Sequence, residues 1–269
     1  MKTLTLVPIG GLANRFYAIT SAIAFCKDYN IKLRVIWFKD KGMGADFHSL
    51  FKLSEDVDKS NVEVIDAKWY HYIYDRPRKR NLWLPWLWQY LLFSKRVDEG
   101  KQLHITHEIL ETKHLYLTHF CQFYKMNPDL SVIKPNEYIE SLIKEKKSIF
   151  PDRIIGVHIR RGDHQLSIKE SPLFVFINKM KKEIELYPDT FFYLASDSLN
   201  EKKQLISIFG NRIITDLSPT RRDNNEGIVL AVVELYLLSA TKRIYGYSGS
   251  TFSVLASQIS GIDYQSCHV

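Results

Sequence analysis

Two adjacent arginines stand in a short segment, residues 158–163, that reads His-Ile-Arg-Arg-Gly-Asp. An apolar run over residues 154–157 precedes it and predicts a strand that ends at these side chains. Arg160 and Arg161 present planar, permanently charged donors that match the oxygens of a phosphate. Two such groups at one loop could neutralise a departing diphosphate and so replace a metal ion. The plain structural alternative is that both arginines pair with surface carboxylates.

Three further segments and one helix carry groups that suit phosphate or base recognition. Residues 10–15 read Gly-Gly-Leu-Ala-Asn-Arg, and the glycines allow backbone N–H groups to turn towards an anion. Residues 249–253 read Gly-Ser-Thr-Phe-Ser and open an expected helix, whose N-terminus favours phosphate, although N-capping explains the hydroxyls as well. Asp197 ends a strand-like run, where a capping role is equally consistent. Glu234 is a carboxylate within an otherwise apolar helix.

The elements that must position these groups form two alternating patterns. Residues 3–38 read as a β-α-β unit, and residues 153–260 continue the alternation in the manner of a doubly wound sheet. The expected strands cover residues 3–7, 31–38, 154–159, 191–195, 212–215 and 243–247, and the expected helices cover 13–29, 172–186, 199–209, 226–239 and 251–259. We therefore predict an α/β fold with two domains, residues 1–150 and 151–269, that face a cleft.

The middle of the chain, residues 41–147, shows no clear period and is rich in aromatic side chains. Within it, residues 82–93 form an apolar run that contains three tryptophans and a proline. The run is too short to span a bilayer, which needs about 20 apolar residues. Cations on both sides resemble those of an interfacial membrane anchor. A buried helix, or an aromatic wall for acceptor sugars, would explain the run as well.

Composition excludes several classes of protein. The 269 residues are 45% hydrophobic, which is enough for a substantial core. A net charge of +7 favours an anionic partner, but no zinc-finger, KH or RRM signature points to nucleic acid. Three cysteines without metal-ligand spacing predict neither a disulfide framework nor a metal site. The N-terminal segment has no signal-peptide pattern, so we expect a cytoplasmic protein.

Taken together, the segments 10–15, 158–163 and 249–253 resemble the superfamily of α1,2-, α1,6- and protein O-fucosyltransferases, which includes the nodulation fucosyltransferases. The resemblance is firmer over residues 154–260 than over residues 1–50. It implies two Rossmann-like domains of the GT-B type, GDP-fucose as the donor substrate, and no metal or cofactor. It further implies a glycan acceptor, which we expect to belong to a bacterial surface polymer.

The resemblance also implies roles for individual residues. Arg160 is expected to contact the β-phosphate and the glycosidic oxygen of the donor. Glu170 occupies roughly the place of a proposed catalytic base, although it could also be a carboxylate at a helix N-terminus. Glu234 stands where the family has an aspartate that binds guanine, so the geometry at the base differs. The donor-binding set is Gly11, Asn14, His158, Arg161, Asp163, Asp197, Glu234, Ser250, Thr251, Phe252 and Ser253. Asp46 and His48 are alternatives for the base on the acceptor side.

We therefore predict an inverting, metal-independent glycosyltransferase that moves fucose from GDP-fucose to a glycan hydroxyl. Its partners would be a nucleotide sugar, a glycan and, through residues 82–93, the inner face of the membrane, but no nucleic acid. Two alternatives remain at this point. The same fold could use another nucleotide sugar, or it could bind a nucleotide or glycan without turnover.

Overall fold

The computed structural model describes residues 2–73, 83–97, 106–125, 127–162, 165–247 and 249–269. Contacts divide the chain into two compact units. The first unit extends to Asn136 and also contains the short segment Arg222–Ile228, and the rest of the chain forms the second unit. The compact units therefore divide before the expected boundary at residue 150, because helix α4 (Glu137–Lys147) belongs to the second unit.

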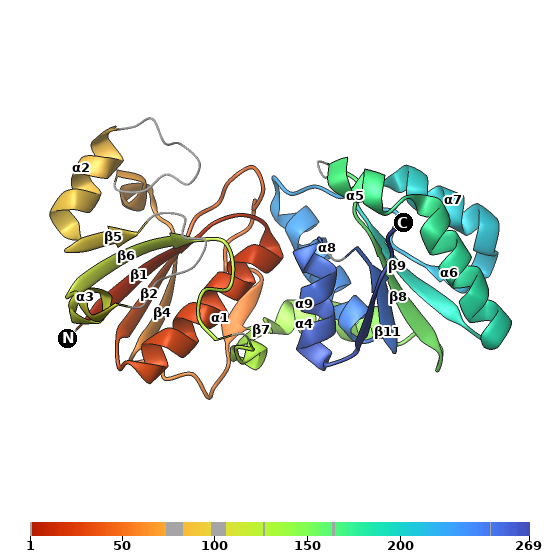
Figure 1. Cartoon of the computed structure of the whole chain (residues 1–269), viewed down its shortest axis with the longest axis horizontal. Helices are drawn as coiled ribbons and strands as arrows, with labels where there is room; N and C mark the ends of the chain where they lie inside the picture. The colour runs from red at the N-terminus through yellow and green to blue at the C-terminus, as the bar shows by residue number, and fades with distance from the viewer. Residues whose placement is uncertain (1, 74–82, 98–105, 126, 163–164, 248) are drawn as a thin grey trace. The chain divides into compact units, whose positions relative to one another are not determined.

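A five-stranded parallel sheet forms the centre of the first unit, in the order β4-β2-β1-β6-β5. Its strands are β1 (Thr3–Pro8), β2 (Lys32–Trp37), β4 (Val62–Asp66), β5 (Lys95–Val97) and β6 (His114–His119). Helix α1 (Leu12–Asp28) joins β1 to β2 and covers one face of the sheet (Figure 1). The apolar runs of β1 and β2 are almost wholly buried, as expected for strands inside a parallel sheet.

Short elements fill the segment that shows no period in the sequence. They are β3 (Phe51–Leu53), η1 (Trp69–Ile73), α2 (Trp83–Leu92), α3 (His107–Glu111), η2 (Leu130–Val132) and β7 (Ile133–Pro135). Strands β3 and β7 pair antiparallel, apart from the main sheet. The same segment contributes β4, β5 and β6, so the sequence analysis missed three strands of the main sheet. Strand β5 has only three residues, which is too few to establish a period.

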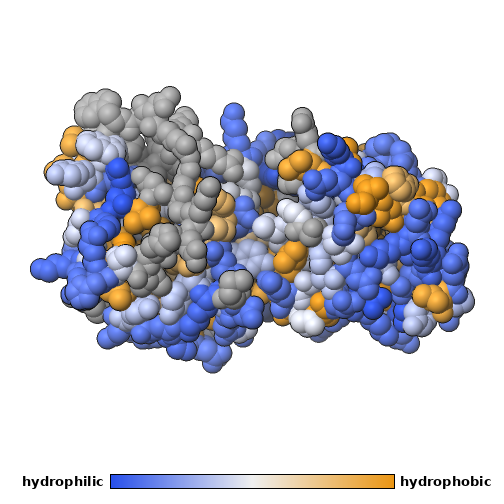
Figure 2. Space-filling model, viewed as in Figure 1, coloured by the Kyte–Doolittle hydropathy of each residue, from blue (hydrophilic) through white to orange (hydrophobic). Residues whose placement is uncertain are grey.

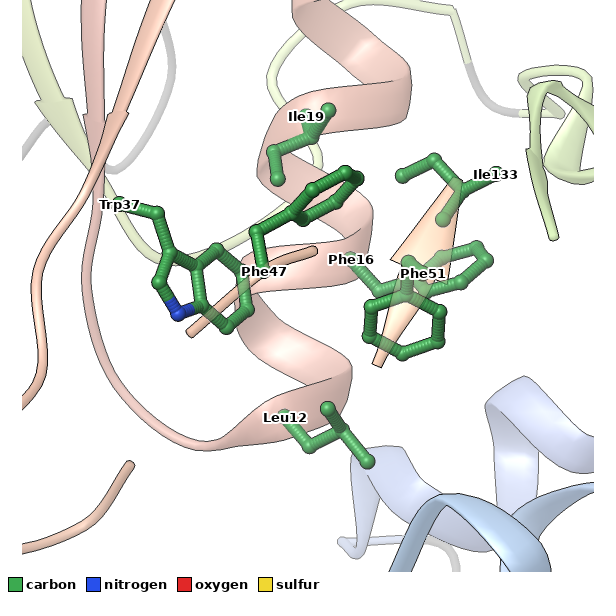
Figure 3. A pocket seen from close by; sticks show the side chains of 7 residues that line it. All are labelled: Leu12, Phe16, Ile19, Trp37, Phe47, Phe51 and Ile133. Atoms are coloured by element: carbon green, nitrogen blue, oxygen red, sulfur yellow. The ribbon is translucent and has the colours of Figure 1, made fainter. Parts of the chain in front are cut away.

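Aromatic side chains close the core between α1 and the β3–β7 ribbon. A small hollow there is lined by Leu12, Phe16, Ile19, Trp37, Phe47, Phe51 and Ile133 (Figure 3). The rings of Phe16 and Phe51 meet edge to face, with their centroids 5.9 Å apart. The hollow has no volume that a water molecule could enter. It is therefore part of the packed core and not a ligand site.

The second unit is built around another parallel sheet, in the order β10-β9-β8-β11-β12. Its strands are β8 (Ile154–Ile159), β9 (Phe191–Ser196), β10 (Ile213–Ile214), β11 (Arg243–Gly246) and β12 (Asp263–Ser266). The helices besides α4 are α5 (Gln165–Glu170), α6 (Leu173–Leu186), α7 (Leu199–Phe209), α8 (Asn225–Ser239) and α9 (Thr251–Ser260). Helices α6 and α7 cover one face of the sheet, and α8 and α9 cover the other (Figure 1).

The core of the second unit lies under α6 and α7. Apolar side chains of β8 and β9, among them Val157 and Leu194, pack there against Phe176 and Leu205. The strand predicted over residues 212–215 is reduced to the two residues of β10, because the 3₁₀ turn η3 (Gly210–Arg212) precedes it. Strand β12 was not predicted, since its sequence, Asp-Tyr-Gln-Ser, is mostly polar and occupies the edge of the sheet.

Candidate functional site

The sheet order places the loop that begins at Arg160, here called the arginine loop, at a topological switch point. Strand β8 lies between β9 and β11, so the chain first builds the sheet outward through β9 and β10 and later returns to the other side of β8. Open α/β sheets bind ligands outside the carboxyl ends of the strands at this point. The loops that begin at Arg160 and at Tyr247 follow the two strands concerned. This topology, which no single segment of sequence reveals, makes the loops the candidate site.

Arg160 is held at the end of β8 by a carboxylate from the neighbouring strand. Its Nη1 lies 3.0 Å from Oδ2 of Asp197, and its side chain is one-fifth exposed. Oδ1 of Asp197 accepts a hydrogen bond of 2.7 Å from the backbone N–H of Arg161. Asp197 therefore fixes both the loop and the guanidinium. Gly162 permits this approach, because a Cβ there would stand 2.8 Å from the Asp197 carboxylate.

Asp197 is not the cap of the helix that follows it. The N-cap of α7 is Ser198, whose hydroxyl accepts a hydrogen bond of 3.3 Å from the backbone N–H of Glu201. The carboxylate of Asp197 instead contacts Arg160 and the backbone of Arg161.

Arg161 points into the protein. Its side chain is buried, its Nε donates to Glu201 of α7 at 2.6 Å, and its Nη1 donates to the carbonyl of Arg160 at 3.1 Å. These contacts assign the guanidinium a structural role in holding β8 to α7. We expected Arg161 to bind the donor, and its position offers a phosphate little of the guanidinium.

His158 is buried at the end of β8, and its ring lies against that of Phe252 in α9, with centroids 5.0 Å apart. Burial, and to a smaller extent the charge of Arg160, lower the pKa of His158 to about 3. The imidazole is therefore neutral near pH 7. Among the described residues, Nδ1 of His158 has no hydrogen-bond partner.

Helix α9 begins beside this histidine. Ser250 is its N-cap but makes no side-chain capping bond, and Thr251 is exposed at the first position. The helix N-terminus thus presents backbone N–H groups that favour an anion. The buried hydroxyl of Ser253 lies 3.3 Å from the hydroxyl of Tyr264 in β12. Of the predicted hydroxyl cluster, Ser250 and Ser253 are buried and Thr251 is exposed.

Glu234 lies inside the second unit on α8 and is paired. Its Oε1 lies 3.4 Å from Nζ of Lys202, which is also buried and donates a 2.7 Å hydrogen bond to the carbonyl of Asp216. Burial raises the pKa of Glu234 to about 7, although the charge of Lys202 opposes the shift. Lys202 was not predicted as its partner, since lysine is rarely found fully buried.

Glu170 ends the short helix α5 and does not begin a helix, so the alternative of an N-terminal helix carboxylate is not supported. It is exposed, and its Oε2 accepts a hydrogen bond of 2.5 Å from the hydroxyl of Tyr247, which follows β11. This bond raises the pKa of Tyr247. Tyr247 therefore ties the carboxylate to the loop at the switch point, and the sequence analysis did not single it out.

The glycine turn of the first unit follows β1 and is held in place by hydrogen bonds from Arg15. This fully buried side chain donates to the carbonyl of Gly10 at 3.0 Å and to Asp40 at 2.9 Å. Gly10 adopts a left-handed φ of 88°, and Gly11 is the N-cap of α1. Asn14 is partly exposed in the first turn of the helix. The predicted turn therefore exists, with Arg15 as its support.

The acceptor-side candidates follow β2 and lie close to the end of β4. Nδ1 of His48 donates to Oδ2 of Asp66 at 2.6 Å, and Asp46 pairs with Lys39 at 2.8 Å. The hydrogen bond to Asp66 raises the pKa of His48, and burial opposes the shift in part. His48 and Asp66 form a dyad, which the sequence analysis missed because Asp66 lies in the segment without a period.

The remaining predictions concern Asp163, a membrane-spanning helix and a metal site. Asp163 lies outside the described residues. No helix in the described part of the chain is long and apolar enough to cross a bilayer. Within the same residues, no three His, Cys, Asp or Glu side chains gather as a metal-binding group.

Comparison with known proteins agrees with the fold derived above. No family model matches the chain, and no curated protein matches its sequence. Solved structures do match, and those compared here are fucosyltransferases of the GT-B type, so the predicted fold class is confirmed.

One of these structures is NodZ α-1,6-fucosyltransferase, known from Bradyrhizobium, soaked with GDP-fucose. It is 16% identical, with a TM-score of 0.65 over 96% of this chain and 92% of that one. A mutant of Arabidopsis thaliana FUT1 in complex with GDP is 15% identical, with a TM-score of 0.67 over 98% and 70% of the two chains. POFUT1 in complex with GDP is 10% identical, with a TM-score of 0.56 over 100% and 98%. At these identities the likeness establishes the fold alone.

Proposed function

We propose that this protein is a glycosyltransferase that moves fucose from GDP-fucose to a glycan hydroxyl, with inversion and without a metal ion. The observation that carries the proposal is the surroundings of Arg160 at the switch point of the second unit. A fixed guanidinium, a neutral buried His158 and the N-terminus of α9 come together there. These groups match the diphosphate and nucleoside of a nucleotide sugar. The fold likeness to fucosyltransferases, some bound to GDP or GDP-fucose, favours this donor.

The reaction would proceed as the bond between fucose C1 and the β-phosphate oxygen breaks. The electron pair of that bond stays on the leaving GDP, and the sugar takes on oxocarbenium character. Arg160 would donate to the oxygen on which charge develops, and a fixed donor of this kind stabilises the transition state more than the ground state. Metal independence rests on this positive charge. Asp197 would keep the planar group in place as the phosphate leaves.

The acceptor hydroxyl must bond to C1 from the opposite side and lose its proton. We propose Glu170 as the group that takes this proton, because its carboxylate is exposed and is tethered by Tyr247. We assign the acceptor to the first unit and the donor to the second, with a surface glycan as the acceptor and the cytoplasm as the location. These assignments rest on the resemblance and on the sequence.

The experiment measures GDP release from GDP-fucose against a panel of glycans. Arg160→Lys keeps the charge but loses the planar fork, so we expect kcat to fall about 100-fold. Calorimetry should show a much smaller change in the affinity for GDP. Arg243→Lys is the matched control, since Arg243 forms a surface ion pair with Asp263 at the opposite end of β11. This control should keep wild-type turnover.

Each other outcome decides between the alternatives. Unchanged turnover in Arg160→Lys contradicts the assigned mechanism. Release of nucleotide from another GDP-sugar in preference to GDP-fucose shows a different donor in the same site. Binding of GDP without release on any acceptor supports a binding module that lacks turnover.

A further inference from the structure

Helix α2 of the first unit buries a polar side chain and exposes large apolar ones. Its polar residue Gln89 is buried, with 8% exposed, and accepts a hydrogen bond of 3.2 Å from Arg96 of β5. Apolar residues on the same helix face outward, and Tyr90 and Leu91 are 71% and 63% exposed. A helix at the surface of a protein in water normally shows the reverse pattern. Something other than water is therefore expected to cover the outward side.

The outward side of α2 continues onto η1. We define the aromatic face as Trp69, Trp86, Trp88, Tyr90, Leu91 and Leu92, all exposed large side chains. Helix α2 contacts η1, and Trp69 of η1 is 81% exposed. The rings of Trp86 and Tyr90 stack with their centroids 5.9 Å apart. In Figure 2 the surface over α2, at the upper left, shows orange and pale side chains.

Charge and residue type indicate what covers this face. Residues 69–97 contain six Lys or Arg and a single acidic residue, Asp75, which gives a local net charge of +5. Arg96 lies over the ring of Trp86 at 5.7 Å. Tryptophan and tyrosine side chains favour the depth of the lipid headgroups, and cations beside them favour anionic lipid. A helix of ten residues cannot cross a bilayer, but it can lie in the plane of its surface.

We propose that the aromatic face docks on the surface of an anionic lipid bilayer, with α2 lying parallel to the membrane plane. The apolar side chains enter the headgroup region, and Arg96, which lies over the ring of Trp86, meets the lipid phosphates. This inference does not depend on the proposed transferase activity, because it concerns the first unit alone.

The experiment uses the full chain and sedimentation with vesicles. Vesicles of phosphatidylcholine alone are compared with vesicles of equal parts phosphatidylcholine and phosphatidylglycerol, at low and at high salt. We expect sedimentation with the anionic vesicles that high salt weakens. The five tryptophans all lie between residues 37 and 88, so their emission should shift to the blue on binding.

Substitutions on the face identify the surface. Leu91→Gln and Tyr90→Ser should each weaken partitioning about tenfold or more, from the apolar area that no longer enters the bilayer. Leu186→Gln is the matched control, because this leucine is 71% exposed at the end of α6 in the second unit. This control should bind as the wild type does.

Several results would overturn the proposal. These are failure to sediment with anionic vesicles at low salt, equal binding to neutral vesicles, or the same loss in Leu186→Gln as in Leu91→Gln. A concentration-dependent dimer in analytical ultracentrifugation that Tyr90→Ser abolishes would show that a second copy of the chain covers the face instead.

Discussion

The buried pair of Lys202 and Glu234 allows a prediction with a defined magnitude. Both side chains are almost fully buried, and their charged atoms lie 3.4 Å apart. Lys202→Met keeps the length of the stem but removes the charge and the hydrogen bond to the carbonyl of Asp216. The carboxylate of Glu234 then has no buried cation beside it, which is the costly way to break such a pair.

The size of the effect depends on pH, because Glu234 can take up a proton. Its pKa of about 7 in the folded protein is above its ordinary value, so the native state holds a proton that the unfolded chain has released. In the wild type, the contribution of Glu234 to the free energy of unfolding therefore falls as pH rises towards 7 and is constant above it. Without Lys202 the folded pKa is higher still, so the fall continues above pH 7 at about 1.4 kcal/mol per pH unit.

We therefore expect Lys202→Met to cost about 1 kcal/mol at pH 6, where Glu234 is neutral in both proteins and only the carbonyl bond is lost. At pH 9 the additional cost should reach about 3 kcal/mol. Urea unfolding at the two pH values, monitored through hydrogen exchange of the α8 amides, measures this difference in the second unit. Tryptophan fluorescence would report on the first unit, since all five tryptophans lie there.

The double variant Lys202→Met/Glu234→Gln is the control for charge. It removes the titrating group, so its stability relative to the wild type should no longer fall between pH 6 and pH 9. An equal loss at both pH values in Lys202→Met would refute this account, because it would show that packing and not the buried charge sets the cost.

Two further predictions concern ion pairs beside the candidate sites. Arg161→Met should destabilise the second unit by about 3 kcal/mol, because Glu201 loses its buried partner. The affinity for GDP should stay close to that of the wild type. A large loss of affinity in calorimetry with little loss of stability would instead place Arg161 on the donor. Asp66→Asn should lower the pKa of His48 in an NMR titration, and the variant should lose more stability below pH 6 than at pH 9, since the pair stabilises the folded state while His48 is protonated. An unchanged titration would exclude the dyad.

The sequence by itself determined strands β8, β9 and β11 of the second unit and the place of Arg160 at the end of β8. Apolar runs of four to six residues with turn residues behind them are local signals, and burial on both faces of a parallel sheet explains their strength. The β-α-β unit at the start of the chain was predictable for the same reason. The glycine turn before α1 was also visible, because a left-handed φ at Gly10 requires a particular residue type.

Only the tertiary structure decided which charged groups meet. Arg161 pairs with Glu201 40 positions away, and Lys202 pairs with Glu234 32 positions away. Nothing in either local segment distinguishes these partners from a free donor-binding group. The direction in which α2 faces was likewise undetermined, because an apolar run has the same sequence whether it packs inward or outward. Residue type and period are local properties, whereas pairing and exposure depend on where the chain returns in space.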